Sequence, residues 1–144
     1  MKIKPLVYDK LQTGHTSFIV DFTLDNNITF IQGDSGVGKS AVFSFLKELS
    51  AEDKKIKCFN YLDKNKKFNS SIKQSKNKVF IIDNADLLLD DALRRHISAD
   101  AENQYIIIGR NPSGLLLDLR ELNELQSETL NGKTVFTLKK VFDI

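Results

Sequence analysis

The chain has 144 residues, of which 41% are hydrophobic, so it can bury the core of one domain spanning residues 1–144 and leaves little room for a second. A formal net charge of +2 is too small to indicate nucleic-acid binding by itself, and the single cysteine, Cys58, excludes an internal disulfide and a cysteine-based zinc site. No stretch approaches the roughly 20 apolar residues of a membrane span, and the first residues lack the apolar region of a signal peptide, which predicts a cytoplasmic protein without membrane partners.

Two strands are predicted in the first third of the chain. Residues 17–24 alternate apolar and polar side chains, which is the period of a half-buried strand, and Ile28 starts a second strand after turn residues 25–27. This pattern predicts an antiparallel hairpin that leads directly into a glycine-rich turn. Residues 2–8 suit another strand, which Pro5 would confine to an edge of the sheet.

A phosphate-binding pattern, G-x-x-x-x-G-K-[ST], follows the Ile28 strand and ends at Ser40. Its glycines allow backbone conformations that other residues resist, so successive N–H groups can turn inward around a phosphate. An amphipathic helix that begins near Lys39 adds free N–H groups and the positive end of its dipole. Lys39 is expected to reach the β- and γ-phosphates, and the Ser40 hydroxyl to ligate Mg²⁺. The expected phosphate-binding residues are Gly33, Asp34, Ser35, Gly36, Val37, Gly38, Lys39, Ser40 and Ala41.

Lysines are concentrated between Lys54 and Lys78. A short strand is predicted at residues 56–62, and residues 63–77 are polar with little to bury, which predicts a loop. The lysines suit a basic surface for nucleic acid or another anionic partner. A solvated loop is the favoured interpretation, because arginine and aromatic residues are sparse there and the whole chain is nearly neutral.

Two further apolar runs end in polar residues. Residues 79–82 precede Asp83, as expected of a buried parallel strand whose carboxyl end meets a ligand crevice. Asp83 is expected to hold a Mg²⁺-bound water opposite Ser40. The alternative is that the Asp83 side chain caps the following turn. Residues 104–109 form a similar run before Arg110 and Asn111. Either side chain could contact the γ-phosphate or orient the attacking water, or the segment could be a polar turn closed by Pro112.

The remaining segments complete the predicted elements. Asp90 and Asp91 suit the first turn of a helix with an apolar face that reaches Ile97. Residues 115–125 are ambiguous between helix and strand, although Leu115, Leu119 and Leu122 favour a helix. Asn131-Gly132 is a strong two-residue turn signal and predicts a C-terminal hairpin that joins residues 128–130 to 133–138.

Together these segments resemble the AAA and ABC-type branch of P-loop ATPases. Gly33 to Ser40 is similar to a Walker A motif, Val79 to Asp83 to a Walker B motif, and Ile106 to Asn111 to the strand with a polar sensor. The resemblance covers residues 16–111. It implies an α/β, three-layer P-loop NTPase fold with a mainly parallel sheet plus antiparallel N-terminal and C-terminal hairpins. It also implies ATP and Mg²⁺ as ligands, and places the sensor strand between the loop strand and the Asp83 strand.

The chain departs from that branch at the position that polarises the attacking water. Most members have a glutamate after the Walker B aspartate, whereas this chain has Asn84, and an amide cannot act as a general base. Asp86 is a possible substitute. There is no Leu-Ser-Gly-Gly-Gln signature and no length for a helical lid. The residues expected to act in hydrolysis are Lys39, Asp83, Asn84, Asp86 and Asn111.

Three functions remain open from the sequence. The first is a slow nucleoside triphosphatase that uses ATP and Mg²⁺ and is assisted by a partner or by self-association. The second is a non-hydrolysing, nucleotide-dependent binding switch for a protein or nucleic-acid partner, which Asn84 favours. The third is a small-molecule kinase, for which only Arg94 and Arg95 are available to cover the phosphates. The phosphate loop reads phosphates and not the base, so ATP and GTP are not distinguished.

Overall fold

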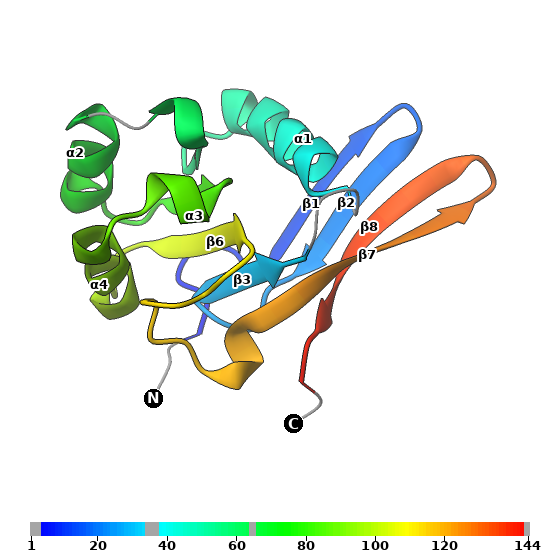
Figure 1. Ribbon diagram of the computed structural model, residues 1–144. Coiled ribbons are helices and arrows are strands. Elements are labelled where there is room, and N and C mark those ends of the chain that lie inside the picture. Colours follow the sequence, from blue (N-terminus) through cyan, green and yellow to red (C-terminus); the bar gives the residue numbers. More distant parts are fainter. Residues whose placement is uncertain (1–3, 34–37, 64–65, 143–144) are drawn as a thin grey trace.

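A computed structural model describes residues 4–33, 38–63 and 66–142. Eight strands form one mixed sheet in the order β1-β2-β8-β7-β3-β6-β5-β4, and the sheet curls into a half-barrel (Figure 1). The strands are β1 (Lys10–His15), β2 (Phe18–Thr23), β3 (Ile28–Gln32), β4 (Ile56–Phe59), β5 (Val79–Ile82), β6 (Gln104–Gly109), β7 (Leu122–Leu130) and β8 (Lys133–Lys140). The helices are α1 (Lys39–Glu52), α2 (Lys66–Gln74), α3 (Ala85–Leu88) and α4 (Asp91–Ala99), with 3₁₀ turns η1 (Tyr61–Asp63) and η2 (Leu119–Glu121).

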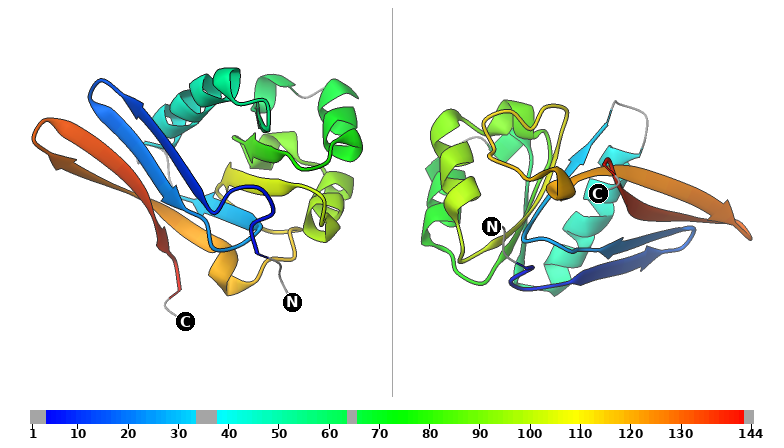
Figure 2. Two further views of the ribbon diagram at one scale, coloured as in Figure 1. Left: turned by 180° about the vertical axis from the view of Figure 1, so that it is seen from behind. Right: turned by 90° about the horizontal axis from the view of Figure 1, so that it is seen from below.

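The sheet has a parallel part and a part built from hairpins. β4, β5, β6, β3 and β7 run parallel to one another. β1 and β2 form one antiparallel hairpin, β7 and β8 form another, and β8 pairs with β2 in parallel. Figures 1 and 2 show both hairpins projecting side by side, away from α2, α3 and α4.

The expected three-layer P-loop fold with a mainly parallel sheet is wrong. The sheet is mixed and curved, and helices are few and short: the described part of the chain has four α-helices, the longest of 14 residues. The physical reason lies after residue 111. The segment expected to form a helix and a short terminal hairpin forms the long strands β7 and β8, which enter the middle of the sheet between β2 and β3. With β7 and β8 in this position, the sheet continues into the two antiparallel hairpins as a curved surface and not as a flat layer.

The expected position of the sensor strand is confirmed. β6 lies between β3 and β5, with Ile107 beside Phe30 on one side and Ile106 beside Ile81 on the other. Every residue of β5 and β6 is buried, because both strands lie inside the sheet with both of its faces covered, and Gln104 is the one of them with an amide side chain. This order brings the ends of β3, β6 and β5 to one edge of the sheet.

The N-terminal hairpin is formed by different strands from those expected. β2 pairs with β1, whereas β3 pairs with β6 and β7, so residues 17–24 do not form a hairpin with the Ile28 strand. The expected edge strand at residues 2–8 is also wrong for its described part, because β1 begins at Lys10. β1 gave little sequence signal, since Leu11 is its only buried side chain.

Two segments adopt a different secondary structure from the one expected. Residues 63–77, expected to be a loop, contain α2, because Phe68 and Ile72 lie four residues apart and are both buried. Residues 115–125, expected to be a helix, contain η2 and the start of β7, where Leu122 pairs with Phe30 of β3. The C-terminal hairpin is confirmed around its Asn131-Gly132 turn and is longer than expected.

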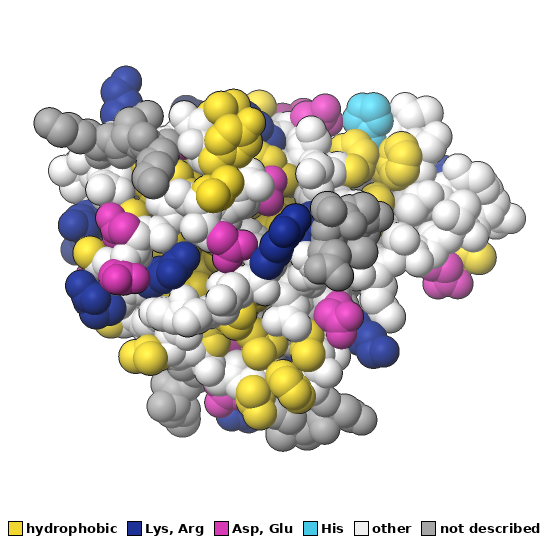
Figure 3. Space-filling view, in the orientation of Figure 1, with side chains coloured by type: hydrophobic (Ala, Val, Ile, Leu, Met, Phe, Trp, Pro, Cys, Tyr) yellow, Lys and Arg dark blue, Asp and Glu magenta, His cyan; other side chains and the backbone are white. Residues whose placement is uncertain are grey.

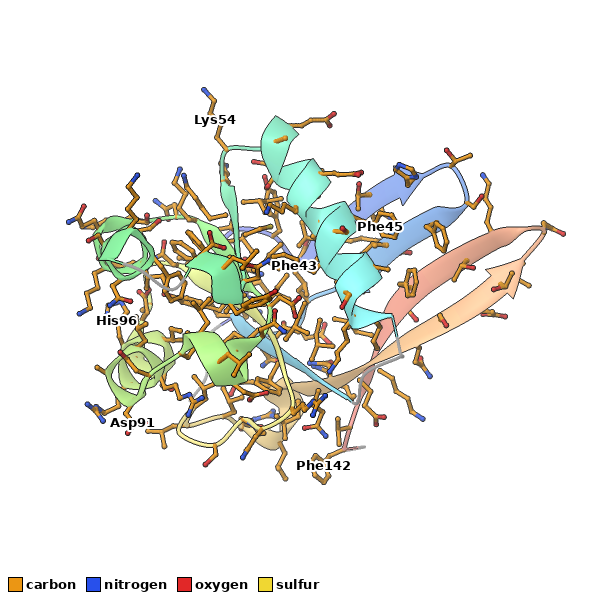
Figure 4. The ribbon with its side chains drawn as sticks, turned by 45° about the horizontal axis from the view of Figure 1, so that its top comes forward. Phe43, Phe45, Lys54, Asp91, His96 and Phe142 are labelled. Carbon is orange, nitrogen blue, oxygen red and sulfur yellow. The ribbon has the colours of Figure 1, made fainter. Side chains whose placement is uncertain are left out.

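Alternating side chains of the strands fill two cores, one on each face of the sheet. Phe43 and Leu46 of α1 pack with Ile31 and Ile106 on one face. Figure 4 shows Phe43 pointing from α1 toward the sheet, while Phe45 points toward the β1–β2 hairpin, where its ring lies 5.3 Å from that of Phe18. The opposite core contains buried side chains of α2, α3 and α4. α1 is therefore fixed over the sheet along its whole apolar face, which holds its first turn rigidly.

A short N-terminal strap, residues 6–8, is held against the sheet by two buried amide side chains (Figure 2). The Gln104 amide accepts the N–H groups of Val7 and Tyr8, both at 2.9 Å, and donates to the Tyr8 carbonyl at 2.8 Å. Asn27 accepts the Leu6 N–H at 3.0 Å. No helix in the described ranges is long and apolar enough to cross a membrane.

Candidate functional site

A cavity of about 490 Å³ opens where β5 and β6 end and α1 begins. This volume lies within the range of small-molecule sites. The lining residues are Gly38, Lys39, Ser40, Ala41, Asp83, Asn84, Asp86, Ile108, Gly109 and Arg110. The sequence predicted seven of these ten as site residues from separate motifs, and the strand order brings them together. Figure 3 views this face and shows acidic and basic side chains side by side near its centre.

The first turn of α1 faces the cavity without a side-chain cap. The helix begins at Lys39 after Gly38, and among the described residues no side chain caps it and no acidic residue stands in its first turn. N–H groups in a first helical turn have no acceptor inside the helix, and they form the positive end of its dipole. The Lys39 ammonium donates a hydrogen bond to the Gly33 carbonyl. The start of α1 can therefore bind an anion.

Gly38 is required at its position for two separate reasons. Its φ of 98° is a left-handed conformation that L side chains resist, and an added Cβ would lie 2.8 Å from the ring of Phe136. Phe136 belongs to β8, so the C-terminal hairpin packs directly against the residue that starts α1. Sequence reasoning missed this contact, because nothing local to Gly38 points to a strand about 100 residues later.

Asp83 is half-buried at the end of β5. Burial raises the pKa of its carboxyl, while the hydrogen bond from the Asn84 N–H and the charge of Lys39 lower it without cancelling the effect of burial. The Asn84 N–H lies 2.9 Å from the Asp83 Oδ1 atom. The negative charge of Asp83 is therefore incompletely compensated within the protein, which favours the approach of a cation.

The residues present fit a magnesium ion. Ser40 and Asp83 line the same cavity and offer a hydroxyl and a carboxylate, the hard oxygen ligands that Mg²⁺ prefers. No group of three or more His, Cys, Asp and Glu side chains is placed to hold a metal in the part of the chain that the structure describes. Mg²⁺ does not need such a cage, because it is commonly held by one or two protein oxygens together with phosphates and water.

Asn84 has an unusual backbone conformation. Its φ and ψ of 53° and 43° are left-handed, and it precedes the four-residue helix α3. Among residues with a side chain, asparagine adopts this region most readily, because its short amide can bond locally. Asparagine at this position is therefore explained by the backbone, independently of chemistry in the cavity.

We expect Asn84→Ala to lower the free energy of unfolding by about 1 kcal/mol, because alanine pays the cost of a left-handed conformation. Asn84→Gly should leave stability nearly unchanged, since glycine adopts this conformation freely. Urea denaturation of the three proteins measures both effects. Equal losses in the alanine and glycine variants would show instead that the amide side chain carries the stabilisation.

Asp86 binds the segment that follows β6. Its two carboxylate oxygens accept the backbone N–H groups of Arg110 at 2.8 Å and Asn111 at 3.2 Å. The Asn111 side chain does not line the cavity, because its amide oxygen accepts the Ser113 N–H at 2.9 Å in a local turn. Asparagine before Pro112 is typical of such turns. Of the five residues expected to act in hydrolysis, Lys39, Asp83, Asn84 and Asp86 lie together and Asn111 lies outside the lining.

The remaining residues singled out from the sequence differ in whether the structure describes them. Asp34, Ser35, Gly36 and Val37 lie outside the described residues. The Arg94 side chain packs against Gly114, because a Cβ added to that glycine would lie 3.0 Å from Arg94 Cδ. Arg95 is exposed on α4. Neither arginine lines the cavity, so the structure provides no arginine-bearing cover from α4 for a kinase reaction. Arg110 does line it, from the loop after β6.

No family model matches this chain, and no curated protein matches it either.

Proposed function

We propose that this protein binds a nucleoside triphosphate together with Mg²⁺ and hydrolyses it slowly. One observation carries the proposal: the uncapped start of α1, with Lys39 and Ser40, opens into the same cavity as Asp83. An anion-binding helix end next to an incompletely compensated carboxylate suits a ligand that combines negative charge with a metal ion. A phosphorylated nucleotide with Mg²⁺ has both.

Each residue has a distinct role in this proposal. The backbone N–H groups between Gly33 and Ala41 hold the phosphates, and the Lys39 ammonium bonds the β- and γ-phosphate oxygens. Ser40 and Asp83 hold Mg²⁺, which when bound neutralises charge that develops on the phosphates. Asn84 can orient a water molecule but cannot accept its proton, so turnover is slow unless a partner or a second copy assists.

A non-hydrolysing binding switch is the second candidate, and two observations favour it. Asn84 replaces a carboxylate, and both oxygens of Asp86 already accept backbone N–H groups, so neither residue is an evident general base. In this candidate, bound nucleotide controls the contact of the protein with a protein or nucleic-acid partner. Lysines 54 to 78 offer a surface for nucleic acid, which we do not favour because the chain is nearly neutral. A cytoplasmic location, where ATP and Mg²⁺ are present, fits both candidates.

Calorimetric titration of the purified protein tests the proposal. We expect ATP or GTP with Mg²⁺ to bind, and EDTA to weaken the binding, since the metal joins the phosphates to Ser40 and Asp83. AMP is the matched control, because it carries the base and sugar without the phosphates that Lys39 contacts. Equal affinity for AMP and ATP, or no binding of either, would refute the proposal. Phosphate release measured in the same samples separates the hydrolase from the switch.

A further inference from the structure

The two hairpins form the projecting part of the sheet, in the order β1-β2-β8-β7, and this part has two open edges. β1 ends the sheet and pairs only with β2. β7 pairs with β3 as far as Glu124, and beyond that residue β8 is its only neighbour within the described strands. The right view of Figure 2 shows β1 in dark blue and β7 in orange at the two margins. Edges of this kind can pair with a strand of another chain.

The register of β1 shows which of its backbone groups point outward. Leu24 donates its N–H group to the Asp9 carbonyl at 2.8 Å, so these two residues form a hydrogen-bonded pair. Residues of an antiparallel ladder alternate between bonded and non-bonded pairs, so every second residue from Asp9 onward bonds β2. The residues between them turn their N–H and C=O groups away from β2, and they are Lys10, Gln12 and Gly14.

These outward groups are accessible. All three residues are exposed, and no other backbone partner for them is found within the described residues. Gly14 has no side chain, so its exposure is that of its backbone, and a Cβ built on it would have no described atom within 4 Å. Edge strands are commonly protected by proline, a bulge or several charges. β1 has one lysine, Lys10, and its register with β2 is continuous from there to His15, without a bulge.

The open edge of β7 is less suited to pairing with a second copy of itself. By the same alternation, Ser127 and Thr129 point outward there. Leu125 would be the third such residue, but its side chain lies beside Gly38. Two copies paired antiparallel through the two remaining residues would place Glu128 directly opposite Glu128 of the second copy. Like charges in directly opposite positions destabilise a strand pair.

The edge of β1, in contrast, is self-complementary. A two-fold axis through Gln12 places this residue opposite its own copy and Lys10 opposite Gly14, so all three outward residues exchange backbone hydrogen bonds. No like charges are then opposite each other, and the open space at Gly14 accommodates the lysine side chain of the other copy. Shifting one copy by two residues in either direction loses one of the three bonded pairs.

We propose that the edge of β1 pairs antiparallel with β1 of a second copy of this chain, which joins two sheets into one across a two-fold axis. The inference does not depend on the proposed function, because no residue of β1 is among the described residues that line the cavity. The dimer is expected to be weak, with a Kd on the order of 100 µM, because one strand from each copy gives a small interface. Nucleotide should leave this Kd unchanged.

Sedimentation equilibrium of the wild type and of Gln12→Pro, up to about 1 mM protein, tests the proposal. Proline removes an outward N–H donor at the centre of the interface in both copies, without removing a hydrogen bond to β2. We expect the Kd of the dimer to rise by at least about 10-fold, with little change in the Tm of the monomer. Thr13→Pro is the matched control, because it removes an N–H group that bonds β2 and should lower the Tm.

A second pair of variants isolates the register. Gly14→Lys places a lysine opposite Lys10 of the other copy, whereas Gly14→Glu places a glutamate there. Both add a long side chain at the same exposed position, and φ of Gly14 is not in the left-handed region. We expect the glutamate variant to dimerise about 10-fold more tightly than the lysine variant, because each opposed pair occurs twice in the two-fold interface.

Four results would overturn the inference. The first two are a wild type that stays monomeric at about 1 mM and a dimer that persists unchanged in Gln12→Pro. The third is an equal Kd for the two Gly14 variants. The fourth is a dimer that forms only with bound nucleotide, since its interface would then lie at the cavity. A loss of Tm in Gln12→Pro but not in Thr13→Pro would reverse the assignment of the outward groups and remove the basis of the proposal.

Discussion

Lys39→Ala is expected to weaken ATP binding by about 10- to 100-fold, the largest loss that a single side chain of the cavity should cause. Lys39 is the only lysine among the described residues that line the cavity, and it is the first residue of α1. Its side chain is half-buried, lies outside both cores and donates a hydrogen bond to the Gly33 carbonyl. The Tm should therefore change little, and calorimetric titration and thermal denaturation of the same sample measure the two effects.

Lys47→Ala provides the matched control for this variant. Lys47 is on the same helix, is exposed, and does not line the cavity, so its loss removes an equal charge without touching the ligand. A similar loss of affinity in both variants would mean that net charge, and not the position of Lys39, attracts the nucleotide. Unchanged ATP affinity in Lys39→Ala would remove the lysine from the site.

Gln104→Leu should cause the largest loss of stability, about 2–4 kcal/mol in the free energy of unfolding. The Gln104 side chain is fully buried and makes three hydrogen bonds to the backbone of Val7 and Tyr8. Leucine fills a similar volume but leaves two N–H groups and one carbonyl without their partner, and an unsatisfied buried group costs about 1–3 kcal/mol. The estimate is below the full sum, because the strap itself is half-buried and water reaches part of it.

Gln126→Leu is the control for the same chemical change on a strand. Gln126 is exposed on β7, and no hydrogen bond of its side chain is found within the described residues. Its substitution should change the urea midpoint little. If Gln104→Leu proved as stable as the control, the strap would contribute nothing to the fold, and the amide would be a passive filler of the core.

The parts of the fold that the sequence predicted correctly are those with a strong local pattern. β5 and β6 are continuous apolar runs, and Asp90 precedes α4 as its cap, accepting the Leu93 N–H at 2.8 Å. α2 was missed because lysines outnumber its buried side chains, Phe68 and Ile72. The curvature of the sheet could not be predicted, because it depends on the pairing of β2 with β8, which lie more than 100 residues apart and carry no pairing signal.

Residues of the candidate site could be predicted where a sequence motif includes them. They could not be predicted where tertiary contacts decide whether a side chain lines the cavity. Lys39, Ser40 and Asp83 were found because their spacing to glycines or to a buried strand is diagnostic. Arg110 and Asn111 are neighbours and both are polar, but only Arg110 lines the cavity, because the Asn111 amide takes part in a local turn. The sequence signal for this turn, an asparagine followed by proline and serine, was present. It was compatible both with a polar turn and with a side chain that contacts the ligand.

The insertion of β7 and β8 between β2 and β3 sets an order for the formation of the native state during translation. β7 and β8 follow the other six strands in the sequence but are internal to the sheet, so a ribosome that has released only the first 110 residues exposes β2 without its neighbour β8 and β3 without its neighbour β7. Phe136 reaches Gly38 only after β8 has emerged from the ribosome. Pairings of such large sequence separation close slowly, because a long loop must lose its entropy before they form. The contact between Gly38 and β8 should therefore form after the other strands of the sheet have been synthesised.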